Sequence, residues 1–358
     1  MILQLSGIRL NAFIASFVLM FTVACNEENK KENVVENIGT GQMPCITTDR
    51  SGNLYVVYGS GDSIFYTSSG EGGKGYSQPE LVAVLPGLAA SAMRGPQIAA
   101  TTDGIIVTAC NKPGDIFLYN KEKKGKWLPA YKLNDADTVA KEGLMALHAD
   151  GDHAFAVWLD LRNGHNQIFG SGSADGGKTW TKNKQIYASP DMTVCECCKP
   201  SVYVKDKHVY VMFRNWLHGN RDLYLIQSDD SGLTFGTAQK LGTGNWPLTG
   251  CPMDGGGIAV QDNGVVQTVW RRQNKIYSCE PGQPEKEIGE GKGCTLALVK
   301  NEPVYTWTEK GEIICKLPST AQKKIGKGRS QMIKQAGTNK LVCVWENENK
   351  IYSQIINL

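Results

Sequence analysis

The feature that most constrains this chain is a weak internal repeat. Short stretches of alternating apolar and polar residues recur at intervals of roughly 35 to 50 residues, separated by Gly, Asn, Asp and Pro. No segment shows a sustained helical period. Regularly spaced short strands of this kind are typical of propellers and related arrays, in which each unit buries its apolar face against the next. The sequence therefore predicts an all-β fold built from repeated four-stranded units.

Seven units emerge when the repeat is aligned by its second and fourth strands. Six of the seven second strands end at an aromatic residue, and the aligned positions are Tyr58, Cys110, Trp158, Phe213, Trp270, Trp307 and Trp345. Four of the fourth strands end in an apolar residue followed by Gly-x-Gly, at positions 38–41, 241–244, 288–291 and 325–328. We predict a β-propeller of seven four-stranded blades. A six-bladed ring with one unit misassigned is the alternative.

The two ends of the repeat are complementary. The last unit, residues 329–358, stops after its third strand, and residues 34–39 resemble the fourth strands at 284–289 and 322–326. We therefore expect the N-terminal strand to complete the last blade. This closure pairs strand edges that would otherwise be exposed.

The N-terminus has the pattern of an export signal. Arg9 precedes a largely apolar run at 12–24, which is short for a membrane span. The small residues before Cys25 resemble a bacterial lipobox, although Thr22 stands where Leu is usual. We predict a signal peptide at 1–24, a lipid on Cys25, a tether at 25–33 and a single propeller domain at 34–358. A cleaved signal peptide with an incidental Cys25 is the alternative. Both predict export, and the first predicts lipid anchoring in the bacterial cell envelope, periplasmic or surface-facing.

Charge argues against a nucleic-acid partner. The formal net charge is +3, and the basic residues are scattered along the chain. Nucleic-acid binding requires a concentrated basic patch or stripe. We therefore expect no nucleic-acid partner, and contact with the membrane only through the lipid.

Two hairpins carry a specific motif. Residues 173–180 read S-x-D-x-G-x-T-W, residues 228–235 repeat it with Phe235 at the end, and residues 69–76 form a degenerate third copy. These segments resemble the Asp boxes of the sialidase-like (BNR or Asp-box repeat) propeller superfamily. The resemblance implies that the boxes face away from the active site, and it assigns Asp175 and Asp230 to folding.

The opposite face is expected to carry function. It is built by the loops that precede each first strand and by the loops that join second to third strands. Arginines there suit a carboxylate, sulfate or phosphate, and the resemblance implies an acidic sugar, since sialidases hold a carboxylate with three arginines. The alternative is that each arginine pairs with a local acid. The candidate substrate-binding residues are Arg94, Arg162, Arg214, Arg271, Arg329, His165, His218 and Trp216.

The catalytic pattern of sialidases is matched in part. Residues 94–96 resemble the family's Arg-Ile-Pro start, and residues 160–162 resemble its acidic-x-Arg feature, but the two lie in different blades. No Tyr-Glu nucleophile pair is identified. Asp160, Asp254 and Glu142 are candidate general acids or bases. The alternative is that each anchors a loop by hydrogen bonds.

Cysteines are numerous for a chain of 358 residues. Eleven are present, and ten remain without Cys25, so an oxidising compartment favours disulfides. Cys279 and Cys315 occupy equivalent third-strand positions and are a candidate pair. The functional face holds a cluster of Cys195, Cys197, Cys198 and Cys251. It is interpreted as disulfides, with a soft-metal site for Cu(I) or Zn or a redox-active pair as alternatives. No other cofactor is expected.

Three functions follow from these observations. The first is a cell-envelope glycan-processing protein, an exo-glycosidase acting on acidic sugars. The second is a non-catalytic propeller that binds glycans or proteins. The third is metal binding through the cysteine cluster.

Overall fold

The structure is a computed structural model that describes residues 1–2, 35–70, 72–123 and 125–358. The described residues from 35 onward form one compact unit. The predicted signal peptide, Cys25 and the tether lie outside the described residues, apart from residues 1 and 2 of the signal peptide. No helix in the described ranges is long and apolar enough to cross a bilayer.

The described residues form seven antiparallel sheets of four strands each, so the predicted all-β propeller with seven blades is confirmed and the six-bladed alternative is wrong. Blade 1 contains β2 (Gln42–Thr48), β3 (Leu54–Ser60), β4 (Ser63–Ser69) and β5 (Glu80–Val84). Blade 2 contains β6 (Gln97–Ala100), β7 (Gly104–Cys110), β8 (Ile116–Glu122) and β9 (Tyr131–Lys132). Blade 3 contains β10 (Met145–Asp150), β11 (His153–Asp160), β12 (Gln167–Ser173) and β13 (Lys184–Tyr187).

The remaining blades follow the same order from inner to outer strand. Blade 4 contains β14 (Ser201–Lys205), β15 (His208–Arg214), β16 (Leu223–Ser228) and β17 (Gln239–Lys240). Blade 5 contains β18 (Gly256–Val260), β19 (Val266–Arg272), β20 (Lys275–Cys279) and β21 (Lys286–Glu290). Blade 6 contains β22 (Lys292–Val299), β23 (Glu302–Glu309), β24 (Glu312–Lys316) and β25 (Lys323–Lys327). Blade 7 contains β26 (Arg329–Gln335), β27 (Lys340–Asn347), β28 (Lys350–Asn357) and β1 (Val35–Thr40).

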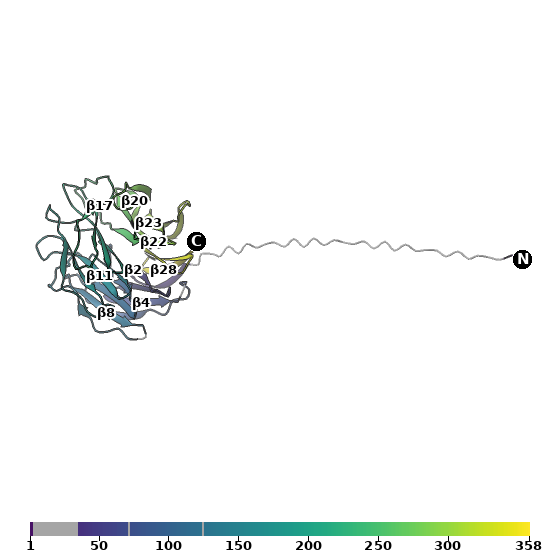
Figure 1. Cartoon of the computed structure of the whole chain (residues 1–358). Coiled ribbons are helices and arrows are strands. Elements are labelled where there is room, and N and C mark those ends of the chain that lie inside the picture. The colour runs from purple at the N-terminus through teal and green to yellow at the C-terminus, as the bar shows by residue number, and fades with distance from the viewer. Residues whose placement is uncertain (3–34, 71, 124) are drawn as a thin grey trace. The chain divides into compact units, whose positions relative to one another are not determined.

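The N-terminal strand closes the ring, as predicted. β1 pairs antiparallel with β28, from Val35 opposite Gln354 to Thr40 opposite Lys350. The first and last blades are neighbours, because β2 contacts both β6 and β26, and β28 lies beside β2 in Figure 1. One blade therefore holds both ends of the propeller domain.

The hydrophobic core is divided among the seven seams between blades. Each seam contains one cluster of buried side chains drawn from two adjacent blades. The aromatic residues that end the second strands supply the largest of these side chains, and Trp158, Trp307 and Trp345 are at most 2% exposed. Blade-to-blade packing of apolar faces is the main stabilising term in such an array.

The Gly-x-Gly repeat has a packing origin. A Cβ atom on Gly289 would lie 2.3 Å from Cζ2 of Trp307, and one on Gly326 would lie 2.6 Å from Cζ2 of Trp345. In each case a fourth strand receives the indole ring of the following blade where no side chain obstructs it. The glycines and the aromatic residues of the repeat are therefore two halves of one contact.

Two of the predicted Asp boxes have closely similar hydrogen-bond networks in the β12–β13 and β16–β17 turns. Asp230 accepts bonds from Ser228 Oγ (2.7 Å), Thr234 N (2.8 Å) and Thr234 Oγ1 (2.5 Å). Asp175 accepts the matching bonds from Ser173 and Thr179. The bonds from Thr234 and Ser228 lower the pKa of Asp230 to about 2. These carboxylates anchor turns, the role that the resemblance implied.

Candidate functional site

One end of the blades holds every residue predicted to bind or react. The connections leading into the inner strands and the turns joining second to third strands all lie at this end, because the blades are antiparallel. We call it the upper face, and the end with the Asp boxes the lower face. The upper face has three groups of interest: a cysteine cluster, a set of paired arginines and a polar pocket.

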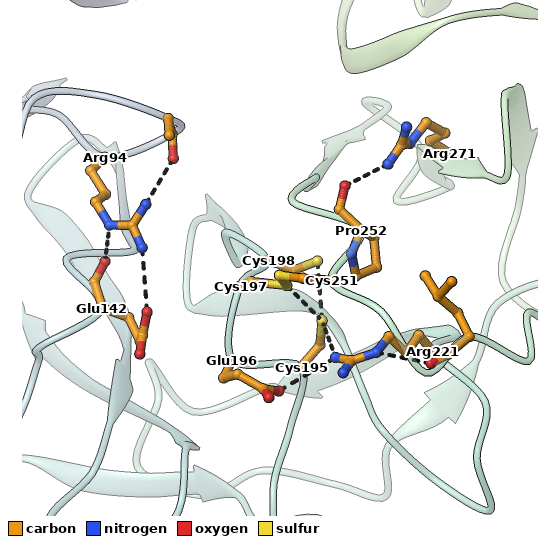
Figure 2. The surroundings of a disulfide bond; sticks show 12 residues. Arg94, Glu142, Cys195, Glu196, Cys197, Cys198, Arg221, Cys251, Pro252 and Arg271 are labelled. Carbon is orange, nitrogen blue, oxygen red and sulfur yellow. Dashed lines mark hydrogen bonds and ion pairs between the residues drawn. A yellow bond between two sulfur atoms is a disulfide. The ribbon is translucent and has the colours of Figure 1, made fainter.

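The cysteine cluster joins blades 4 and 5 (Figure 2). Cys195, Cys197 and Cys198 lie in the β13–β14 connection, and Cys251 lies in the β17–β18 connection. A disulfide joins Cys197 to Cys251, with the Cα atoms 6.2 Å apart. Cys195 and Cys198 carry free thiols whose Sγ atoms are 3.2 Å apart. The disulfide thus links the two loops. The two free thiols face each other beside it.

The broader prediction that the cysteines pair is wrong for most of them. Eight described cysteines are free and buried: Cys45, Cys110, Cys195, Cys198, Cys279, Cys294, Cys315 and Cys343. Cys279 and Cys315, the candidate cross-blade pair, pack in different seams, between blades 4 and 5 and between blades 6 and 7. A buried free cysteine behaves as a small apolar side chain, which explains their occurrence in the seams.

A guanidinium group contacts the free thiol pair. Arg221 is 3% exposed, and its Nη1 lies 3.0 Å from Cys195 Sγ and 3.4 Å from Glu196 Oε2. The bond with Cys198 lowers the pKa of Cys195 against the opposing effect of burial, and the nearby arginines lower it further. Burial raises the pKa of Cys198. Cys195 is therefore the thiol of this pair that loses its proton first.

Two of the five predicted arginines lie together beside this cluster. Arg214 donates from Nη2 to the carbonyl of Arg271 (2.8 Å) and from Nη1 to the carbonyl of Arg221 (2.8 Å). Arg271 donates to the carbonyl of Pro252 (2.6 Å). Both guanidinium groups lie over the ring of Trp246, at 5.0 and 5.5 Å from its centroid. These arginines order the loops around the cysteines.

Asp254 is buried against Arg271. Its Oδ2 lies 2.7 Å from Arg271 Nε, an ionic contact in which the N–H is not aligned as a hydrogen bond. The carboxylate also accepts bonds from the amides of Gly255 (2.8 Å) and Gly293 (3.3 Å) and is 1% exposed. Burial raises the pKa of Asp254, and the positive charges of Arg271 and Arg214 oppose this effect.

Asp160 and Arg162 form a second internal pair, in blade 3. Asp160 is fully buried and accepts bonds from Trp158 Nε1 (2.8 Å) and from Arg162 Nε and Nη2 (both 2.9 Å). Arg162 Nη1 also binds Asp135 (2.8 Å). Asp160 and Arg162, which form the acidic-x-Arg feature of the sequence, thus pair with each other within one turn.

The other two predicted arginines are also paired. Arg94 donates from Nε to the carbonyl of Glu142 (2.6 Å), and its Nη2 lies 3.3 Å from Glu142 Oε2. Arg329 Nε lies 2.6 Å from Glu346 Oε1. Among the described residues, Arg214 and Arg271 are the members of the predicted set that contact each other.

The remaining candidates occupy the turns of blades 3 and 4. The ring of Trp216 lies 4.2 Å from the guanidinium carbon of Arg221 and so packs on the cysteine cluster. His218 is exposed, and its Nδ1 lies 3.8 Å from Asp191 Oδ2. His165 is half-buried in the turn between β11 and β12.

A pocket of about 420 Å³ opens where blades 1, 2 and 7 meet on the upper face. Its size is within the range of small-molecule sites. Leu88 and two alanines form its apolar part. Its polar side chains are Gln42, Ser60, Ser91, Arg94, Lys112 and Asn349.

Lys112 distinguishes this pocket. It is exposed, and within the described part of the chain it makes no ion pair. The arginine pattern of the sequence identified Arg94 as a candidate, but the other polar residues of the pocket were not among the candidates. They occupy the two loop classes that build the upper face, so their position was the available signal, but Ser, Gln and Asn in loops are too common to single out.

Comparisons with known proteins give two solved structures, a lectin and a polysaccharide lyase, whose TM-scores above 0.5 support the fold. No family model matches the chain, and no curated protein matches it. The BP39L lectin from Burkholderia pseudomallei aligns with a TM-score of 0.65 and 7% identity, over 89% of this chain and 96% of that chain. The polysaccharide lyase Uly1 aligns at 0.55 and 10%, over 94% of both chains. The NanB sialidase from Streptococcus pneumoniae, as its K499G mutant, aligns at 0.49 and 13%, over 91% of this chain and 70% of that chain.

Proposed function

We propose that this protein is a glycan-binding propeller of the bacterial cell envelope that takes an acidic sugar in the pocket between blades 1, 2 and 7. The observation that carries the proposal is the unpaired Lys112 beside hydroxyl and amide side chains in a cavity of about 420 Å³. Hydroxyls and amides suit the many hydroxyl groups of a sugar. An ammonium group without a carboxylate partner suits a sugar carboxylate or sulfate.

The candidate catalytic residues favour binding over hydrolysis. Asp160 and Asp254 are at most 1% exposed, and protein donors already occupy their oxygens. Glu142 is paired with Arg94. A glycosidase requires two carboxyl groups that reach the scissile bond from opposite sides. Since these three carboxylates are held by their neighbours, we favour a non-catalytic role.

The likeness to a lectin and a polysaccharide lyase supports a glycan as the ligand class, because a lectin binds carbohydrate and a polysaccharide lyase acts on it. It does so as an analogy, since one fold hosts many functions. The cell-envelope location rests on the export signal and on Cys25.

The test is binding of the full chain to a panel of acidic and neutral oligosaccharides, measured by calorimetry. Lys112→Ala should weaken binding of the best acidic ligand about 10- to 100-fold, since a charge-assisted hydrogen bond contributes roughly 1.5–3 kcal/mol. Lys207, an exposed lysine in the β14–β15 turn on the lower face, provides the matched control, and Lys207→Ala should leave binding unchanged.

Three results would contradict the proposal. One is the absence of binding across the panel. Another is equal binding by wild type and Lys112→Ala. The third is turnover of a bound glycan, which would favour the exo-glycosidase alternative.

A further inference from the structure

We infer that Cys195 and Cys198 form a binding site for one soft monovalent metal ion, copper(I). This site is separate from the glycan pocket, because it lies between blades 4 and 5, whereas the pocket lies among blades 1, 2 and 7.

The arrangement of the two sulfurs carries this inference. Their Sγ atoms face each other at 3.2 Å, and Figure 2 shows both directed into the centre of the loop cluster. The two residues are 0% and 2% exposed. They are spaced as C-x-x-C, which places both side chains on one side of a tight turn. Among the other described free thiols, no two sulfurs are within hydrogen-bonding distance, although Cys315 and Cys343 share the seam between blades 6 and 7.

The number and type of donors select the metal. Thiolates are soft ligands and favour Cu(I) or zinc over hard cations. Structural zinc takes four protein ligands. The disulfide withdraws Cys197 and Cys251 as thiolates, so two sulfurs remain. Two thiolates match Cu(I), which accepts low coordination numbers, and they do not complete a zinc site.

The charge of the filled site is balanced. Two thiols bind one Cu⁺ and release two protons, which leaves a bis-thiolate centre with one negative charge. A buried charge requires a partner. Arg221 supplies one positive charge at 3.0 Å from Cys195 Sγ, and Trp216 packs on its outer face. Arg221 also pairs with Glu196 at 3.4 Å, and Arg214 adds a second positive charge that acts on both sulfurs, so two guanidinium groups balance one carboxylate and the negative copper centre.

Burial argues for an ion over a protein disulfide as the reaction partner. Thiol–disulfide exchange requires that one sulfur approach the other in line. Cys195 and Cys198 lie beside the disulfide and are at most 2% exposed, so another protein chain cannot reach them. An ion can pass where a polypeptide cannot.

The experiment is an anaerobic titration of the full metal-free chain with Cu(I) against a chromogenic Cu(I) chelator. We expect one Cu(I) per chain, no competition from Zn²⁺, and two sulfur ligands by X-ray absorption spectroscopy. Cys195→Ser and Cys198→Ser should each abolish binding. Arg221→Gln should weaken it about 10–100-fold, the usual effect of losing a group that supports a ligand.

Two controls separate the site from general effects on folding. Cys279→Ser changes a buried thiol in a seam and should retain one Cu(I). The double variant Cys197→Ser/Cys251→Ser should also retain it if circular dichroism shows the native fold. Loss of copper by the folded double variant, three or four sulfur ligands in the spectrum, or a Cys195–Cys198 disulfide in the purified chain would each overturn the inference.

Discussion

Ile38 tests whether the N-terminal strand closes the ring. It lies in β1, is 5% exposed and packs in the seam between blades 7 and 1 with Ile46, Val56 and Tyr58. Ile38→Ala removes three carbon atoms, which corresponds to about 2.4 kcal/mol of lost burial at roughly 0.8 kcal/mol per carbon. The cavity left behind adds to this, so the free energy of unfolding should fall by about 2–5 kcal/mol.

The assay is urea unfolding of the full chain, followed by tryptophan fluorescence. Val35→Ala is the matched control, because Val35 lies in the same strand but is 45% exposed. It should cost about 0.5 kcal/mol or less. A cost below about 1 kcal/mol for Ile38→Ala, or equal costs for the two variants, would mean that β1 does not complete blade 7 in solution.

Three further predictions concern the repeat and its carboxylates. Gly289→Ala should destabilise the fold by roughly 1–3 kcal/mol in urea, because the added methyl meets the ring of Trp307; an unchanged midpoint would contradict the packing origin of Gly-x-Gly. The pKa of Asp230 in the folded state is about 2, below its unfolded value. Its contribution to the free energy of unfolding is therefore complete above about pH 4 and is lost as pH falls toward 2. Unfolding midpoints measured across this range should decline less in Asp230→Asn, and parallel curves would refute the linkage. Asp160→Asn should cost about 1–3 kcal/mol in urea, because it removes one of the two carboxylates that hold Arg162, with glycan affinity unchanged; a loss of affinity in the folded variant would identify Asp160 as a ligand-binding residue.

The fold was predictable because its determinants are local and repeated. Six of the seven blades place an aromatic residue at the end of the second strand, where blade 2 has Cys110, and several fourth strands provide the glycine that receives the ring. The position of Ile38 before Gly-x-Gly identified β1 as a fourth strand without any knowledge of its partner. Ring closure followed from counting strands.

The site was less predictable because its contacts cross between blades. Arg94 and Glu142 are 48 residues apart, and their pairing depends on how the blade 2 and blade 3 loops fold over each other. Disulfide formation from Cys197 to Cys251 depends in the same way on two long loops. The sequence places such residues on one face, but it does not determine which of them neutralise each other.

The positions of the cysteines in the seams also explain why the expected oxidising compartment did not predict which cysteines form disulfides. An oxidising environment favours disulfides only where two cysteines can meet. Cys279 and Cys315 cannot, because separate seams enclose them.

The ring keeps apart the two sites proposed on the upper face. The sugar pocket uses loops of blades 1, 2 and 7, and the thiol pair uses loops of blades 4 and 5. In a closed ring of seven, blade 3 separates them on one side and blade 6 on the other. Effects of distant substitutions on free energy usually add. The affinity for a glycan should therefore not depend on copper. The loss of unfolding free energy in the double variant Lys112→Ala/Cys195→Ser should equal the sum of the losses in the two single variants. Coupling between the two would require a motion of the whole ring, which the seven packed seams oppose.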